Sequence, residues 1–291
     1  MKQTIRLSLI VLAASVRPFL TLAAEPPELD KGIAAAGSGK IEDAAVLLAK
    51  AVDQGSDQAR WLLARLHGAG KMKGASLVKA RELLEAAAQA GYGPAAYDLA
   101  RLAEAGALSA GKPDKDQTVF YFKGAAESGL AVAQYRMGNY AATGEAGARD
   151  EKAALEWFKK GAEQTHRPSM LAAALLLDRA GDLKGATALL EGAANLDYAP
   201  AFNDLGVRYL QGKALPVDEK LAFALFRSAA IRGLAAAHIN LGLCAENGRG
   251  LKKDADGAAR SYLIAAKAGH PVGQFLAAEA AEKTGDRKSV V

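Results

Sequence analysis

Small and apolar residues recur along this chain with a period of about 36 residues. Turn residues mark the period, and the intervals between them are 36, 38, 36, 32, 36 and 36 residues. Each marker has Ala or Gly four residues before it and nine residues after it. The markers are Gly55, Gly91, Gly129, Thr165, Asp197, Gly233 and Gly269. A fixed period of this length indicates tandem copies of one structural unit, and the small positions predict that helices cross closely there.

Each copy divides into two helical segments. In the copy from Ala201 to Gly233, residues 201–209 place apolar side chains at helical spacing, Gly212 and Pro216 break the pattern, and residues 222–230 resume it. One pair of helices cannot bury both sides of its apolar stripe, so neighbouring pairs must stack on one another. The Ala-rich pairs also lack period-two runs of β-branched residues. The pattern therefore predicts an all-α solenoid without strands.

Two stretches carry a resemblance to a known family. Residues 154–164, Ala-Leu-Glu-Trp-Phe-Lys-Lys-Gly-Ala-Glu-Gln, resemble the second helix of the Sel-1-like repeat (SLR) family, and residues 133–138, Ala-Gln-Tyr-Arg-Met-Gly, resemble its first helix. The resemblance covers six linked copies between about residues 57 and 285, with good copies at 131–165, 199–233 and 235–269. It implies a right-handed α/α superhelical solenoid of stacked helix-turn-helix repeats, related to the tetratricopeptide repeat. The copy at 169–197 departs from the pattern, because a short turn at 180–182 joins its helices.

The repeats also set the expected organisation of the chain. We expect a signal peptide at 1–24, an N-terminal capping helix pair at 25–56, Sel-1-like repeats at 57–270, and a C-terminal capping helix and tail at 271–291. The repeats leave no linker richer than the glycine and serine residues at 37–39. We therefore expect one continuous domain.

The N-terminal residues predict export. Lys2 and Arg6 precede an apolar run from Leu7 to Val16, and small residues at 21–24 offer a cleavage site. This is the layout of a secretory signal peptide, and the run is too short to span a membrane. The predicted location is the periplasm or the outside of a bacterial cell. An uncleaved anchor or a cytosolic amphipathic start are the alternatives, since Arg17 and Pro18 interrupt the run.

Composition changes the picture in two ways. Residues 1–24 hold three basic and no acidic side chains, so the remaining chain has 34 Lys and Arg against 32 Asp and Glu, a net charge of +2. Such a mixed surface offers little electrostatic attraction to nucleic acid. The 51% hydrophobic content rests largely on alanine and only 6% of residues are aromatic. We therefore expect a thin core held by close contact between helices.

Residue types for catalysis or metal binding are scattered. The four histidines, His67, His166, His238 and His270, fall in different repeats, and no spacing suits a metal on one helix. Cys244 has no partner and lies at helical spacing from apolar residues, which favours a buried thiol over a redox role. Nucleotide-binding and hydrolase motifs are missing from the sequence. We expect no cofactor, no metal and no enzymatic activity.

The resemblance to tetratricopeptide repeats suggests where a partner would bind. By that analogy, the sixth and tenth residues after each marker point into a concave groove. The N-terminal half then presents an aromatic and arginine-rich set: Trp61, Tyr97 and Tyr135 at the sixth position, and Arg65, Arg101 and Asn139 at the tenth. The C-terminal half, around Ile239 and Leu243, is aliphatic. Packing between neighbouring first helices is the alternative explanation of the aromatic residues.

The resemblance also sets the functional expectation. Members of the family are mostly non-catalytic scaffolds, and exported members include inhibitors of sensor kinases and assembly factors of the envelope. We therefore expect an exported repeat scaffold that holds a protein or peptide segment in its groove, with a sensor-kinase ectodomain or an envelope assembly protein as the partner. The alternatives are a protein that binds glycan or peptidoglycan fragments and a secreted factor that binds a host protein.

Overall fold

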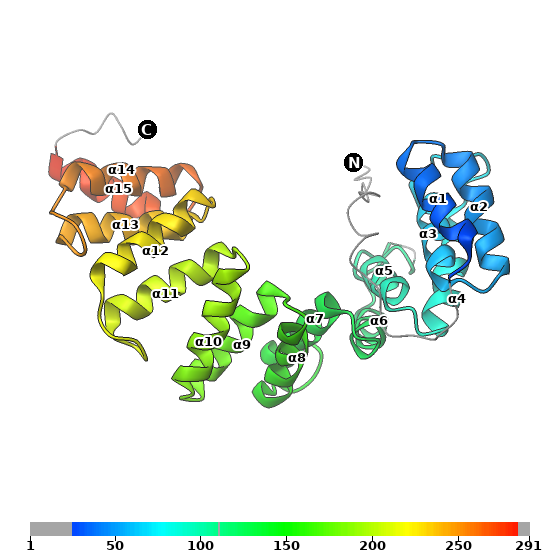
Figure 1. Cartoon of the computed structure of the whole chain (residues 1–291), viewed down its shortest axis with the longest axis horizontal. Coiled ribbons are helices and arrows are strands. Elements are labelled where there is room, and N and C mark those ends of the chain that lie inside the picture. The colour runs from blue at the N-terminus through cyan, green and yellow to red at the C-terminus, as the bar shows by residue number, and fades with distance from the viewer. Residues whose placement is uncertain (1–24, 110, 285–291) are drawn as a thin grey trace. The chain divides into compact units, whose positions relative to one another are not determined.

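The computed structural model describes residues 25–109 and 111–284, and these residues form fifteen helices and no strand (Figure 1). The predicted signal peptide and the last seven residues of the predicted tail lie outside the described residues. The all-α prediction is confirmed for the described part of the chain. All but two of the helices have 12 or 13 residues, as expected of tandem units.

The helices belong to two compact units, which meet at residues 161 and 162 within one helix. The helices up to this boundary are α1 (Pro27–Gly37), α2 (Ile41–Asp53), α3 (Asp57–Ala69), α4 (Leu77–Gln89), α5 (Gly93–Glu104), α6 (Lys115–Glu127), α7 (Ala131–Thr143) and α8 (Glu151–Glu163). The helices after it are α9 (Arg167–Arg179), α10 (Leu183–Asn195), α11 (Ala199–Gln211), α12 (Glu219–Ile231), α13 (Ala235–Asn247), α14 (Ala255–Lys267) and α15 (Pro271–Thr284).

The division into two units concerns the packing of the helices, and the expected domain organisation stays a prediction. In a repeat stack each helix pair contacts only its neighbours, so no shared centre ties distant repeats together. A chain without a linker can therefore still separate into units, and here the change falls inside α8.

The marker residues explain the period of the sequence. All seven have positive φ angles, from 58° at Thr165 to 94° at Gly129, and each lies between a second helix and the next first helix. We use "first helix" for a helix that follows a marker and "second helix" for one that precedes it. After each of six markers, the next N–H donates to the carbonyl of the small residue four positions before the marker, for example from Tyr92 to Ala87 at 2.9 Å. This hydrogen bond closes the C-terminus of a helix. The positive φ angle of the marker favours glycine, which has no Cβ.

Most second helices begin at a residue whose side chain caps the helix. Asp114, Asp218 and Asp254 each accept a hydrogen bond from the backbone N–H three residues later, at the start of α6, α12 and α14. Such caps satisfy N–H groups that the helix leaves without a partner and are each worth about 1 kcal/mol. The caps and the marker turns together determine where each helix starts and ends.

The first close crossing joins the two helices of a pair. The second helix of each pair has a large buried side chain seven residues before its marker. This side chain packs on the Ala or Gly of the first helix, which lies nine residues after the previous marker. A Cβ atom on Gly206 would lie 2.6 Å from Phe226 Cε1, and one on Gly138 or Gly242 would overlap the ring of Phe158 or Tyr262. The expectation of close crossing is right, but the small residue makes room for a ring from the second helix, not for backbone contact alone.

The second close crossing joins a second helix to the next first helix. Here the alanine four residues before a marker packs against a small residue four positions after it, as in the clusters that hold Ala125 with Ala133 and Ala229 with Ala237. These four alanines are at most 1% exposed. In the last such crossing, a Cβ atom on Gly273 would lie 2.7 Å from the Cβ of Ala265. The core is therefore thin and rich in alanine, as the composition predicted.

Substitution of glycine by alanine at two helical positions tests the first crossing. We expect Gly138→Ala to lower the free energy of unfolding by about 1–3 kcal/mol, because the new Cβ overlaps the buried ring of Phe158. The control is Gly124→Ala on α6, where the space around the new Cβ is open and alanine favours the helix by about 1 kcal/mol. Urea unfolding followed by circular dichroism measures both. Equal stability of the two variants would contradict the proposed packing of the Phe158 ring on Gly138.

Candidate binding face

The sequence-predicted site residues lie on three successive first helices of the N-terminal unit, two on each of α3, α5 and α7. We call this surface the α3–α5–α7 face. The residues are Trp61, Arg65, Tyr97, Arg101, Tyr135 and Asn139. Their burial differs widely, and this decides which of them a partner can reach.

Trp61 is a core residue of this face. It is only 4% exposed, its ring centroid lies 5.8 Å from that of Tyr92, and its indole Nε1–H donates to Asp98 Oδ2 at 2.8 Å. The guanidinium of Arg65 lies over the indole, 4.9 Å from the ring centroid. The structure therefore brings Trp61 and Arg65 together but turns the indole away from solvent.

Asp98 connects α3 to α5 at this point. Burial raises the pKa of its carboxyl above the usual value, while the hydrogen bond from Trp61 and the charges of Arg65 and Arg101 partly offset that rise. Arg101 itself is accessible, with a side chain that is 55% exposed and a long ion pair to Glu104. The two predicted arginines thus flank one half-buried carboxyl group on the α3–α5–α7 face.

The two tyrosines pack inward, each on its own second helix. Tyr97 meets Phe122 edge to face with ring centroids 5.4 Å apart, and Tyr135 meets Phe158 with centroids 5.8 Å apart. Both tyrosines remain half-buried, as does Asn139. The aromatic residues therefore do not stack on one another as a ladder, although neither tyrosine is fully buried.

Sequence reasoning missed two further residues of this face, Glu104 and Arg136. Arg136 forms an ion pair with Glu104 between α7 and α5, and its guanidinium lies 4.8 Å from the ring centroid of Phe122. Arg136 and Asp98 both occupy the seventh position after a marker. A polar residue at that position is the signal that identifies Arg136, whereas Glu104 lies thirteen residues after its marker and no such signal marks it.

The first helices of the C-terminal unit form a face of their own. Asn240 donates its side-chain amide to Asn203 Oδ1 at 2.7 Å, which joins α13 to α11. Leu175 and Leu243, at the tenth position after their markers, are exposed on α9 and α13. This face is therefore mixed, with exposed aliphatic side chains beside polar contacts that join successive helices.

A buried ion pair joins α9 to α11 in the same unit. Arg208 is only 4% exposed, and its Nη2 lies 2.6 Å from Asp178 Oδ1. Lys213 Nζ lies 3.2 Å from the other carboxylate oxygen of Asp178. Burial by itself would raise the pKa of Asp178, but the hydrogen bonds and charges of Arg208 and Lys213 outweigh it and hold the pKa below its usual value.

Reactive side chains of the described residues have structural surroundings. Cys244 is buried beside Phe226, and burial raises the pKa of its thiol, which disfavours the reactive thiolate. His67 accepts a hydrogen bond from the backbone N–H of Ser76 at 3.3 Å, and burial lowers its pKa. Within residues 25–109 and 111–284, no cluster of three or more His, Cys, Asp or Glu side chains is arranged to hold a metal ion.

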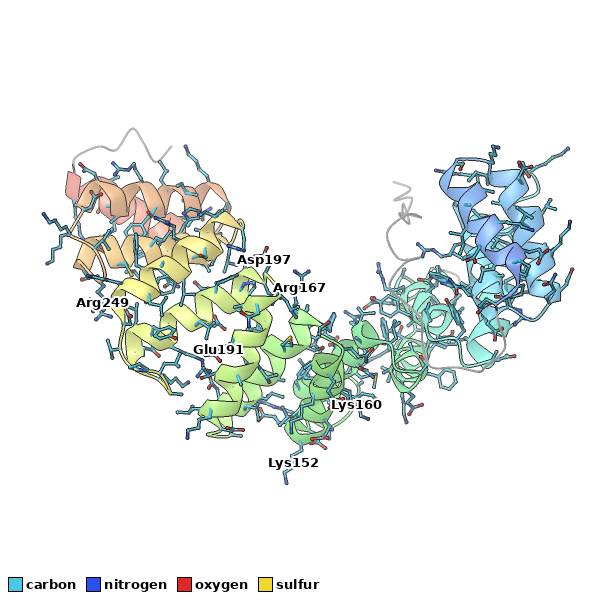
Figure 2. All side chains as sticks on the ribbon, viewed as in Figure 1. Lys152, Lys160, Arg167, Glu191, Asp197 and Arg249 are labelled. Carbon is cyan, nitrogen blue, oxygen red and sulfur yellow. The ribbon has the colours of Figure 1, made fainter. Side chains whose placement is uncertain are left out.

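Both units expose charged side chains. Lys152 extends from α8 and Glu191 from α10, and Arg249 lies in the loop between α13 and α14 (Figure 2). Among the helices of the described residues, none combines the length and the apolar composition that crossing a membrane requires.

The repeats match a known family model. The Sel1 repeat model matches residues 57–92, 93–130, 131–166, 199–234 and 235–270, which together make up more than half of the chain. The chain therefore belongs to the Sel1 repeat family. The family model does not match residues 167–198. In this copy the three-residue turn between α9 and α10 replaces the longer loop of the other copies. The sixth of the expected copies is this divergent one.

Solved structures share the fold. A protective antigen of uropathogenic Escherichia coli with an SLR fold is 23% identical, with a TM-score of 0.76 over 90% of this chain and 58% of that chain. This chain thus spans less than two thirds of the length of the antigen. A Sel1 repeat protein from Oxalobacter formigenes is 28% identical, with a TM-score of 0.64 over 86% of this chain and 75% of that chain. A Sel1 repeat scaffold of this kind suggests protein–protein interaction, and proteins of the family are generally not catalysts.

The buried ion pair predicts a pH-dependent stability. The folded pKa of Asp178 lies below its unfolded value of about 4, so the pair stabilises the fold above that pH, and the stabilisation is lost as the pH falls through the folded pKa. At pH 7 we expect Asp178→Asn to cost about 1–3 kcal/mol, since the buried Arg208 loses the carboxylate with which it pairs, while the charge of Asp204 still acts on it. The difference from wild type should shrink below about pH 4.

Urea unfolding at several pH values measures this effect. The control is Glu219→Gln, which removes an exposed partner of Arg249 at 4.0 Å and should change stability by no more than about 0.5 kcal/mol. A cost of Asp178→Asn that is small or independent of pH would show that the pair does not stabilise the unit.

Proposed function

We propose that this protein is an exported, non-catalytic scaffold that binds a segment of a partner protein on the α3–α5–α7 face. The family and the fold support the scaffold role, because stacked helix pairs present long surfaces assembled before the partner arrives. Such a surface loses little conformational entropy on binding, so many modest contacts suffice. The location of the binding face and the cellular compartment are the further parts of this proposal.

The observation that supports this face is the placement of its arginines. Arg65 and Arg101 flank Asp98, and Arg101 is accessible beside the half-buried Tyr97. Guanidinium groups donate several hydrogen bonds in a fixed plane and suit carboxylates and backbone carbonyls, while the edge of a tyrosine adds apolar contact. The chemistry favours a peptide segment that carries acidic and apolar side chains.

The proposed compartment rests on the N-terminal residues. A basic start, a short apolar run and small residues before Glu25 have the layout of a secretory signal peptide. We infer that the mature chain acts in the periplasm or outside the cell, in the regulation or assembly of signalling or polysaccharide machinery of the envelope. The partner would then be a sensor-kinase ectodomain or an envelope assembly protein.

A charge reversal on the face tests the binding site. We expect Arg101→Glu to reduce capture of the partner from an envelope extract at least tenfold, because an accessible arginine at an interface centre contributes about 1.4 kcal/mol or more. Quantitative mass spectrometry of the captured proteins provides the measurement. Circular dichroism should stay unchanged, since the Arg101 side chain is exposed.

The matched control is Arg149→Glu, which makes the same change of charge in the loop between α7 and α8, where Arg149 is 60% exposed and pairs with Glu151. Equal losses in both variants would indicate a non-specific charge effect. Undiminished capture by Arg101→Glu would move the site away from this face. A cell-wall polymer or a host protein as the main ligand would replace the proposed partner class.

Export is tested separately. When the chain is expressed with its own N-terminus in a Gram-negative host, we expect the product to lose about 20–25 residues and to appear in the periplasmic fraction. Intact-mass spectrometry of the fractions measures the cleavage. A control with Leu9 and Leu12 changed to Asp breaks the apolar run and should leave an uncleaved product in the cytosol. A cytosolic wild-type product that keeps its first 24 residues would contradict the compartment.

A further inference from the structure

The last first helix, α15, differs from the other first helices in its exposure. At the ninth position after a marker, every other first helix buries its Ala or Gly under a large side chain of its own second helix. On α15 the same position is Ala278, and it is exposed. Phe275, at the sixth position, is 68% exposed, whereas Trp61 at the equivalent position of α3 is 4% exposed. Among the described residues, no second helix follows α15.

The exposed residues of α15 form one stripe along the helix. Pro271, Phe275, Ala278 and Glu282 are all exposed and recur at intervals of four, three and four residues, which places them on a single helical face. The stripe contains both halves of the contact that builds the repeats, a protruding ring and a small residue that leaves room for a ring. On the buried pairs these two halves come from different helices, as Phe226 and Gly206 do on α12 and α11.

We propose that α15 is a self-association surface, on which the α15 of a second copy of this chain packs antiparallel, so that Phe275 of each copy lies on Ala278 of the other. A two-fold axis midway between these positions satisfies both contacts at once, because a self-complementary patch needs only one symmetry operation. A foreign helix would need to supply its own ring and its own small residue at the same spacing. The second copy already has both.

Charge also favours the antiparallel arrangement. With Phe275 opposite Ala278, Glu282 of one copy lies near Pro271 of the other, at the N-terminus of that helix. An acidic side chain is stabilising there, since the N-terminal end of a helix carries a partial positive charge. A parallel arrangement would instead bring the acidic residues of the two copies together.

The expected dimer is weak. Two 14-residue helices bury much less than the roughly 800 Å² per partner of a stable interface. We therefore expect a dissociation constant on the order of 10–100 µM. Sedimentation equilibrium of the mature chain between about 1 and 500 µM should show a monomer that becomes a dimer.

Two variants test the contact. Phe275→Gln removes the ring and Ala278→Leu fills its seat, and each should raise the dissociation constant at least tenfold with helix content unchanged. The matched control is Ile231→Gln, which removes an apolar side chain that is 76% exposed at the end of α12. This control should dimerise as the wild type does. A monomer at every concentration, or equal weakening by Ile231→Gln, would overturn the proposal.

Disulfide cross-linking tests the register. In a Cys244→Ser background, a mixture of Gln274→Cys and Glu279→Cys chains should cross-link faster than either chain alone, because the antiparallel pair places 274 of one copy beside 279 of the other. Equal rates in the mixture and in the single variants would overturn this arrangement. A foreign helix that binds α15 while the chain stays monomeric would also overturn the second copy as occupant.

Discussion

Each helix pair depends on one contact, in which a large side chain of the second helix packs on a small residue of the first helix. Without a Cβ at Gly206 or Gly138, a phenyl ring can occupy the space that a side chain would fill, and the two helices approach closely. The same contact joins α1 to α2, where Leu48 packs at Gly32, although residues 25–56 lie outside the copies that the family model matches. The large side chain can be Leu, Phe or Tyr, because the seat needs volume and not a particular ring.

Polar contacts between successive first helices complement this apolar crossing. Trp61 reaches Asp98, Asn240 reaches Asn203, and Arg208 reaches Asp178, each from one first helix to a neighbouring one. Trp61 and Asn203 occupy the sixth position after a marker, which the analogy with tetratricopeptide repeats assigns to a groove. Part of the predicted groove surface therefore stabilises the stack, and the residues that the proposed partner could contact are accessible ones such as Arg101.

The contact of a large side chain with a small residue, which joins the helices of each pair, also explains the proposed role of α15. An exposed alanine has no significance on an isolated helix, but at a position where the equivalent residues are buried it indicates a missing contact. The stack thus uses one type of contact within each pair and presents the two halves of that contact on α15. Recognition of a partner and association of copies would then occupy different helices, with α3, α5 and α7 in the N-terminal unit and α15 in the C-terminal unit.

The sequence alone determined the period, the helical class and the turn positions, because each depends on local chemistry: left-handed turns favour Gly, and small residues recur where helices cross. Only the tertiary structure decided which aromatic residues are available. Trp61 and Tyr97 share a sequence position, yet Trp61 lies in an apolar cluster against Tyr92 and is buried, while Tyr97 is only half-buried. The tertiary structure also decided the boundary at residue 161 and the exposure of Phe275. Both depend on which helices lie beside a residue, and a repeating sequence carries the same local signal whether or not a neighbour is present.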